Sequence, residues 1–260
     1  SIVPYLLLGC MAGFLSGLFG IGGGAIIVPI LLLLFTAREL PEPVMMQLAV
    51  GTSLAVITVT ALSSIRAHMR YGNVQWFLVR KLVPGICIGA LAGSVIAAQL
   101  SFEALRTVFA VFLLLLALQM LIRVKPGSVA RNPSWSLSLP VGCGIGLVSS
   151  LVGIAGGALT TPVLSRWGHT MKKAVATSIT CGFPLAVVGT TGYLVMGWDN
   201  DLLPAGSTGF IYWPAMFWIA LASIFIAPLG ARVAQRLPDQ LLRIVFMLFL
   251  LSVSISMFLK

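Results

Sequence analysis

Two glycine clusters are the residues of this sequence best suited to bind a ligand through their backbone. They consist of Gly20, Gly22, Gly23 and Gly24, and of Gly153, Gly156 and Gly157. Each cluster precedes an apolar run that favours a helix, whose free N–H groups and positive dipole end would point at a ligand. Glycine lets a ligand approach those amides closely. The pattern indicates binding of a small anion; the alternative is that the glycines serve only close helix packing.

Four hydroxyl residues are the next candidates. They lie in two related stretches, AVGTS at 49–53 and AVATS at 174–178, as Thr52, Ser53, Thr177 and Ser178. A hydroxyl can donate a hydrogen bond to an anion without carrying charge. The alternative is that each hydroxyl bonds a carbonyl of its own helix. Weaker candidates flank the second glycine cluster: Ser149, Ser150, Thr160 and Thr161.

Other kinds of site are disfavoured. The six acidic residues all lie at connectors or helix ends, whereas cation and proton-relay sites normally need carboxylates within the membrane. The four cysteines lie in apolar segments without the paired spacing of metal ligands or disulfides. No nucleophile–base pair and no G-x-S-x-G sequence suggests an enzyme. We therefore expect no catalytic residues, no metal and no cofactor.

The elements that position these residues are membrane helices. The chain is 59% hydrophobic and 8% charged, whereas a soluble domain carries about 25% charged residues. Apolar segments fall near 3–35, 43–65, 82–98, 104–122, 137–165, 174–197, 209–231 and 240–259. The run from Ile2 lacks a basic n-region and a cleavage site, so it is expected to be a span rather than a signal peptide. The net charge of +10 lies in short loops, which indicates a lipid bilayer as partner and no nucleic acid.

The chain consists of two related halves. Residues 9–31 (GCMAGFLSGLFGIGGGAIIVPIL) and 142–164 (GCGIGLVSSLVGIAGGALTTPVL) share 12 identities in 23 positions without a gap. Each half continues with an A-V-x-T-S span and two further spans. The predicted division is a first membrane repeat at 1–123, a cytoplasmic linker at 124–136 and a second membrane repeat at 137–260. Such internal symmetry is typical of transporters.

The distribution of basic residues predicts how the glycine-rich segments lie. As one helix, residues 3–35 would be about 50 Å long, well over the bilayer core. If each such segment returns to its own side, 13 of the 16 basic residues face the cytoplasm; if it crosses once, the split is 8 to 8. The positive-inside rule favours the returning hairpin. Each half would then cross the membrane three times and add a hairpin. Because three is an odd number, the second half would be inverted relative to the first. A single crossing by a long kinked helix stays open.

The doubled glycine segment and the two A-V-x-T-S stretches resemble the TauE/SafE family of sulfite exporters over nearly the whole chain. The resemblance implies an inner-membrane, multi-pass permease for sulfur-containing anions such as sulfite, sulfoacetate or related organosulfonates. It also implies that the pathway is lined by Gly22, Gly23, Gly24, Thr52, Ser53, Gly156, Gly157, Thr177 and Ser178. One departure is Ala155, which stands where the first half has Gly22, so the two half-sites are expected to be unequal.

The sequence thus predicts an all-α integral membrane protein of two inverted-topology repeats, each a Gly-broken hairpin plus three transmembrane helices. The predicted function is secondary transport of a small sulfur-containing anion, in the export direction, by alternating access. Its alternatives are a non-transporting membrane scaffold or assembly protein, and a permease for another small anion or a metal ion. A coupling ion such as a proton, and a homo-oligomeric assembly, stay open.

Overall fold

The computed structural model describes residues 2–19, 23–69, 72–121, 132–234 and 239–259, and within them the chain is almost entirely helical. The first-half helices are α1 (Val3–Phe19), α2 (Gly24–Thr36), α3 (Glu42–Met69), α4 (Trp76–Gln99) and α5 (Phe102–Leu121). The second-half elements are α6 (Trp135–Val152), α7 (Gly157–Arg166), α8 (Met171–Met196), β1 (Ser207–Thr208), β2 (Ile211–Tyr212), α9 (Trp213–Ala234) and α10 (Asp239–Leu259). The predicted all-α class is confirmed.

Six of the helices in the described residues are long and apolar enough to cross a membrane: α3, α4, α5, α6, α8 and α9. Shorter apolar helices occur at Val3–Ser16, Gly24–Thr36 and Met247–Phe258. Helices suit this composition because, in lipid, every backbone polar group must be satisfied within its own segment. The protein is accordingly a multi-pass membrane protein. Most of the predicted linker, 124–136, lies outside the described residues.

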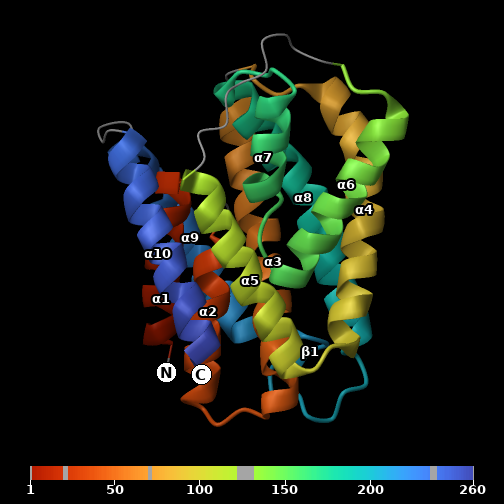
Figure 1. Ribbon diagram of the computed structural model, residues 1–260. Helices are drawn as coiled ribbons and strands as arrows, with labels where there is room; N and C mark the ends of the chain where they lie inside the picture. The colour runs from red at the N-terminus through yellow and green to blue at the C-terminus, as the bar shows by residue number, and fades with distance from the viewer. Residues whose placement is uncertain (1, 20–22, 70–71, 122–131, 235–238, 260) are drawn as a thin grey trace.

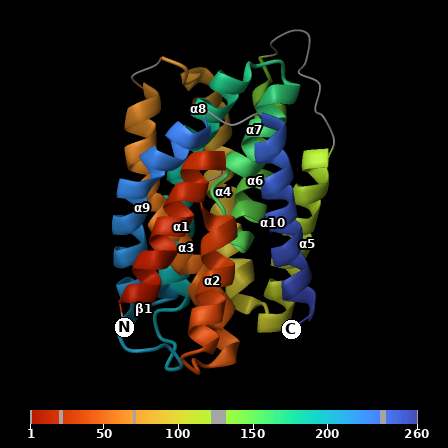
Figure 2. The ribbon, with the colours of Figure 1, turned by 90° about the vertical axis from the view of Figure 1, so that its left-hand side faces the viewer.

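The chain runs up and down the long axis of a bundle (Figure 1). Helix α1 rises from the end at which the N-terminus lies, and α2 runs back to that end (Figures 1 and 2). Side-chain contacts agree, since the guanidinium of Arg38, just after α2, lies 4.9 Å from the ring centroid of Tyr5 near the start of α1. Helices α6 and α7 form a similar pair that opens to the opposite end of the bundle.

Each half supplies a helix to the other. Helix α1 packs along α9 of the second half, and α6 packs along α4 of the first half. Both contacts use small residues, which let helix backbones approach closely within a membrane. A Cβ atom on Gly13 of α1 would lie 2.6 Å from Ser223 Cα of α9, and one on Gly89 of α4 would overlap the Cys143 carbonyl of α6. The two halves are therefore interlocked.

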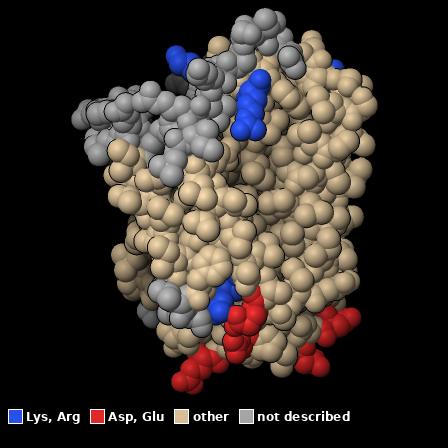
Figure 3. Space-filling model, viewed as in Figure 1, with Lys and Arg blue, Asp and Glu red and all other residues tan. Residues whose placement is uncertain are grey.

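Charged side chains divide between the two ends of the bundle. Five acidic residues lie at the end where α2, α4 and α8 finish, and Asp239, which begins α10, lies at the opposite end; the five are Glu39, Glu42, Glu103, Asp199 and Asp201. Figure 3 shows acidic groups gathered at this lower end. Basic residues near the opposite end include Arg80, Lys81, Arg166, Lys172 and Lys173. The middle of the bundle, between the two ends, carries no acidic or basic residue among those described.

Two short strands were not expected. Residues 209–231 were predicted to form one continuous apolar span, but β1 and β2 pair before α9 begins at Trp213. Their register joins Ser207 to Tyr212 and Thr208 to Ile211. Gly206 and Gly209 have positive φ angles of 88° and 54°, which glycine adopts without steric cost. The turn brings Tyr212 against α3, and the site below depends on that contact.

Candidate functional site

The second glycine cluster forms a turn between α6 and α7. Helix α6 ends at Val152, and Gly153 follows in the left-handed conformation with φ of 69°. This is the usual way to end a helix, and glycine is the residue that best allows it. The turn is closed by a hydrogen bond from Ile154 N–H to the Ser149 carbonyl at 3.2 Å, and α7 begins at Gly157. The helix thus breaks where the glycines predict.

The first glycine cluster makes the corresponding break between α1 and α2. Gly23 has a φ angle of 73°, and its carbonyl accepts hydrogen bonds from the N–H groups of Ile26 and Ile27, both at 3.0 Å. Helix α2 then begins at Gly24. Gly22, a predicted binding residue, lies outside the described residues.

The two breaks meet inside the bundle. Gly24, at the start of α2, lies so close to the second turn that a Cβ there would overlap the Gly153 carbonyl oxygen and sit 2.8 Å from Ile154 Cα. The Ser53 hydroxyl of α3 donates to the same Gly153 carbonyl at 2.8 Å. Of the predicted site residues, Gly24 and Ser53 therefore converge on one point, the α6–α7 turn.

Thr52 and Thr177 have matching roles. Thr52 Oγ1 accepts a hydrogen bond from Tyr212 N–H at 3.0 Å, and Thr177 Oγ1 accepts one from Gln75 N–H at 3.0 Å. Tyr212 directly precedes α9, and Gln75 directly precedes α4. Each threonine therefore satisfies a backbone donor at the start of a helix from the other half, where the first N–H groups lack helical partners. Both threonines are fully buried.

Ser53 and Ser178, although they occupy equivalent positions, have different partners. Ser53 reaches across to the second half, whereas Ser178 shares a hydrogen bond of 2.8 Å with Thr161 of α7, in its own half. Gly156 and Gly157 lie at the start of α7 and are buried. The structure thus places the predicted residues around the two turns and along α3 and α8, and it shows that most of the hydroxyls are bonded to protein groups.

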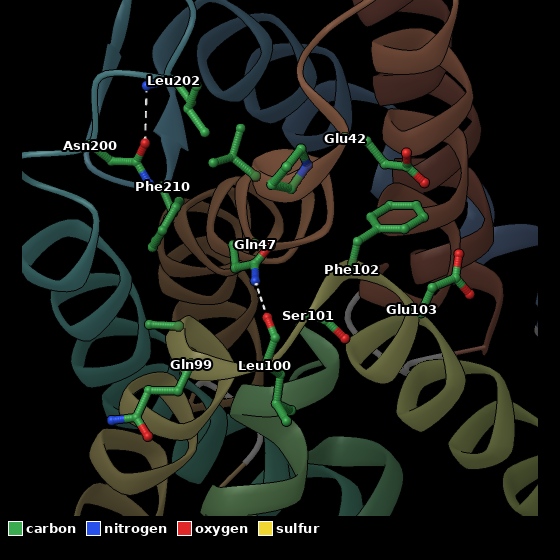
Figure 4. Close-up of a pocket in the computed structure, with 13 residues that line it drawn as sticks. Glu42, Gln47, Gln99, Leu100, Ser101, Phe102, Glu103, Asn200, Leu202 and Phe210 are labelled. Atoms are coloured by element: carbon green, nitrogen blue, oxygen red, sulfur yellow. Dashed lines mark hydrogen bonds between the residues drawn. The ribbon is translucent and has the colours of Figure 1, made fainter.

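One region was not anticipated by the sequence reasoning. A cavity of about 570 Å³ opens at the acidic end of the bundle (Figure 4), lined by Glu42, Pro43, Val44, Gln47, Ala98, Gln99, Leu100, Ser101, Phe102, Glu103, Asn200, Leu202 and Phe210. Gln47 is buried, and its Nε2 donates to the carbonyls of Ala97 at 3.2 Å and Leu100 at 2.8 Å. Its Oε1 has no partner among the described residues. Gln47, a buried amide side chain within an apolar span, is the signal in the sequence that could have pointed to this cavity.

The chain resembles known proteins over its whole length. The family described as sulfite exporter TauE/SafE matches residues 5–257. A probable membrane transporter protein of Haemophilus influenzae is 40% identical over 260 residues, which cover this whole chain and 98% of that relative. A probable membrane transporter protein of Methanocaldococcus jannaschii is 27% identical over 94% of this chain and 90% of its own length. The probable membrane transporter protein YunE of Bacillus subtilis is 30% identical over 78% and 81%, respectively. On these matches, the chain belongs to the TauE/SafE sulfite exporter family of membrane transporters.

Proposed function

We propose that the protein is a secondary transporter that exports a small sulfur-containing anion, such as sulfite, sulfoacetate or a related organosulfonate, across the cytoplasmic membrane. The observation that carries this proposal is the meeting of the two glycine turns inside the bundle, where α2 and α7 begin. The N-terminal end of a helix attracts anions through its free N–H groups and its dipole. The described acidic residues lie away from this point, at the ends of the bundle.

The proposed mechanism is alternating access between inverted repeats. The course of the chain in Figure 1 supports it, because the α1–α2 and α6–α7 hairpins open toward opposite ends of the bundle. Broken helices that meet between such repeats form substrate sites in many secondary transporters. In the proposal, the binding residues are those predicted from the sequence: Gly22, Gly23, Gly24, Thr52, Ser53, Gly156, Gly157, Thr177 and Ser178.

Charge supports the orientation and direction. The basic end, with Arg166, Lys172 and Lys173, would face the cytoplasm by the positive-inside rule and raise the local anion concentration there. The cavity at the opposite end is lined by Glu42, whose charge would favour release of an anion rather than its return, and by Glu103, which is paired with Arg106 at 2.6 Å. Labelling of single cysteines at positions 38, 124 and 200 tests the orientation: a cytoplasmic position 38 would contradict the hairpin topology.

Binding by the purified protein is the direct test of the function. In detergent, sulfite, thiosulfate, sulfoacetate and sulfate are compared for the rise in unfolding temperature that a bound ligand causes. We expect a rise with at least one sulfur anion and anion flux in proteoliposomes. A protein that shows neither with any of these anions would instead be a scaffold, and the proposal would be wrong.

A substitution in the turn tests the site. Gly156→Leu should abolish the anion-dependent rise in unfolding temperature. The variant should still fold, because its Cβ would meet only movable side chains, with the nearest atom, Leu185 Cδ1, at 3.2 Å. Gly23→Leu is the poorer test, since the φ angle of 73° there strains any side chain. The matched control is Gly144→Leu on α6, where a Cβ meets nothing within 4 Å. Unchanged affinity in a folded Gly156→Leu protein would contradict the site.

A further inference from the structure

The two hairpins differ in the chemistry that they bring to their turns. Under the gapless alignment of the halves, Thr160 and Thr161 of α7 stand where α2 has Ile27 and Val28. Aligning the A-V-x-T-S stretches likewise places Gly182 of α8 opposite Ile57 of α3. The second half thus has hydroxyls and an open position where the first half has large apolar side chains.

Thr160 is the one residue of this group whose hydroxyl is both buried and without a partner. Its side chain is 0% exposed, and Oγ1 makes no hydrogen bond to any described residue. A buried hydroxyl left unpaired costs free energy, so such a group calls for an explanation. Oγ1 points back at the turn, 3.4 Å from the place a Cβ on Gly156 would take. The hydroxyl therefore lies beside the N-terminal end of α7.

Helix α8 packs against this turn at Gly182. A Cβ on Gly182 would lie 3.8 Å from Gly156 N and 3.8 Å from the Ala155 Cβ, which is ordinary contact, so a methyl group would fit between α8 and the Gly156 amide. The N–H groups of Gly156 and Gly157 have no backbone acceptor among the described residues. Two backbone donors and one hydroxyl donor thus lie at the start of α7, next to Gly182.

This turn is not completely covered by the rest of the protein. Ala155 is partly exposed although its neighbours Ile154 and Gly156 are buried. Figure 3 shows the surface hollowed near its centre, where Figure 1 places α7, with a basic side chain above the hollow. At Gly24 of the first hairpin a side chain has no room, because the Gly153 carbonyl oxygen lies against the start of α2.

We propose that the anion is bound by the second hairpin alone, through the N–H groups of Gly156 and Gly157 and the hydroxyl of Thr160, next to Gly182 of α8. A sulfite or sulfonate group offers three oxygens, which match three donors. The first hairpin then acts as the wall of the site, not as a second half-site. This inference rests on the proposed function and narrows its binding residues to those of the second hairpin.

The decisive variant is Thr160→Val, which removes the hydroxyl and keeps the shape. A hydrogen bond to a charged group contributes enough that sulfite should bind about tenfold to a hundredfold more weakly. Thr160→Ser retains the donor and should bind nearly as the wild type does. The matched control is Ile27→Val, the equivalent position of the first hairpin, with a dissociation constant within about twofold of the wild type. Sulfite binding is measured by titration calorimetry on the full chain in detergent.

A second variant fills the space between α8 and the Gly156 amide without disturbing the fold. Gly182→Ala adds a methyl group at ordinary contact distance and favours the helix, so the protein should fold and bind sulfite at least about tenfold more weakly. Wild-type affinity in folded Thr160→Val and Gly182→Ala would overturn the site while leaving the transport proposal intact. Equal losses in Ile27→Val and Thr160→Val would show an effect of packing and not of the hydroxyl donor, and would also overturn the site. A wild-type protein that binds no anion fails the proposed function itself.

Discussion

The two glycine hairpins have the same ancestry in sequence but different surroundings in the structure. At Gly24 the chain of the other half fills the position of a side chain, whereas at Gly156 the nearest atoms are the movable ends of side chains. A glycine needed for backbone contact and a glycine that keeps a space open look alike in a repeated sequence. The comparison shows that glycines of two related turns can take separate tasks, one in assembly and the other in binding.

The largest effect is expected from placing a methyl group at the tight turn. Gly24→Ala would drive a Cβ into the Gly153 carbonyl oxygen and within 2.8 Å of Ile154 Cα. Because both atoms belong to the backbone, relief requires a shift of the turn, and overpacking of this kind costs about 3 kcal/mol, the upper end of the usual range. We expect a strongly lowered unfolding temperature and loss of monodisperse protein on size-exclusion chromatography.

The same substitution at two other glycines is the control for this prediction. Gly156→Ala should unfold near the wild-type temperature, since its closest contact, at 3.2 Å, is the flexible end of Leu185. Gly144→Ala should behave in the same way, because its Cβ would face open space. If Gly24→Ala were as stable as these two, the distinction between the hairpins would be lost.

Next in size is the effect of removing the hydrogen bonds that Thr52 and Thr177 each accept from the other half of the chain. Thr52→Val and Thr177→Val each leave a partly buried N–H group, of Tyr212 or Gln75, without its acceptor. Each change should lower the free energy of unfolding by about 1 to 3 kcal/mol, and by a similar amount in the two halves, as measured by thermal unfolding. Anion affinity distinguishes structure from binding: a lower affinity at unchanged stability would show that these hydroxyls contact the substrate.

The smallest effect is expected at Ser53. Ser53→Ala removes the donor to the Gly153 carbonyl, a single neutral hydrogen bond of 2.8 Å, and should lower stability by about 1 kcal/mol. The comparable change in the second half, Ser178→Ala, breaks the contact with Thr161. Both serines contact the second hairpin, but only Ser178 contacts the residue next to Thr160. If Thr160 binds the anion, Ser178→Ala should alter sulfite affinity more than Ser53→Ala does; the reverse order would argue against that assignment.

The sequence predicted what depends on short-range chemistry. Consecutive glycines disfavour a helix wherever they occur, so the breaks before Gly24 and Gly157 were foreseeable. The apolar segments likewise predicted the helices, because backbone in lipid has few other choices. The repeated stretches identified which residues to compare, although not what each one contacts.

The contacts between the two halves could not be predicted from the sequence. The bond from Tyr212 to Thr52 joins residues 160 positions apart, and it depends on the β1–β2 turn that apolar composition concealed. The approach of Gly182 to Gly156 is visible only once α8 lies beside the second turn. Gln47 could have been noticed as an amide within a span, but its cavity is built by three separate segments.

The interlocking of α1 with α9 has a consequence for biosynthesis. Helix α1 leaves the ribosome early, yet the α9 surface that receives Gly9 and Gly13 follows only after residues 20–212 have been made. Until then the glycine face of α1 has no protein partner and is covered by lipid or by the insertion machinery. The first half therefore cannot complete its fold during its own synthesis, and a chain truncated before α9 should be recognised by cellular quality control as unfinished.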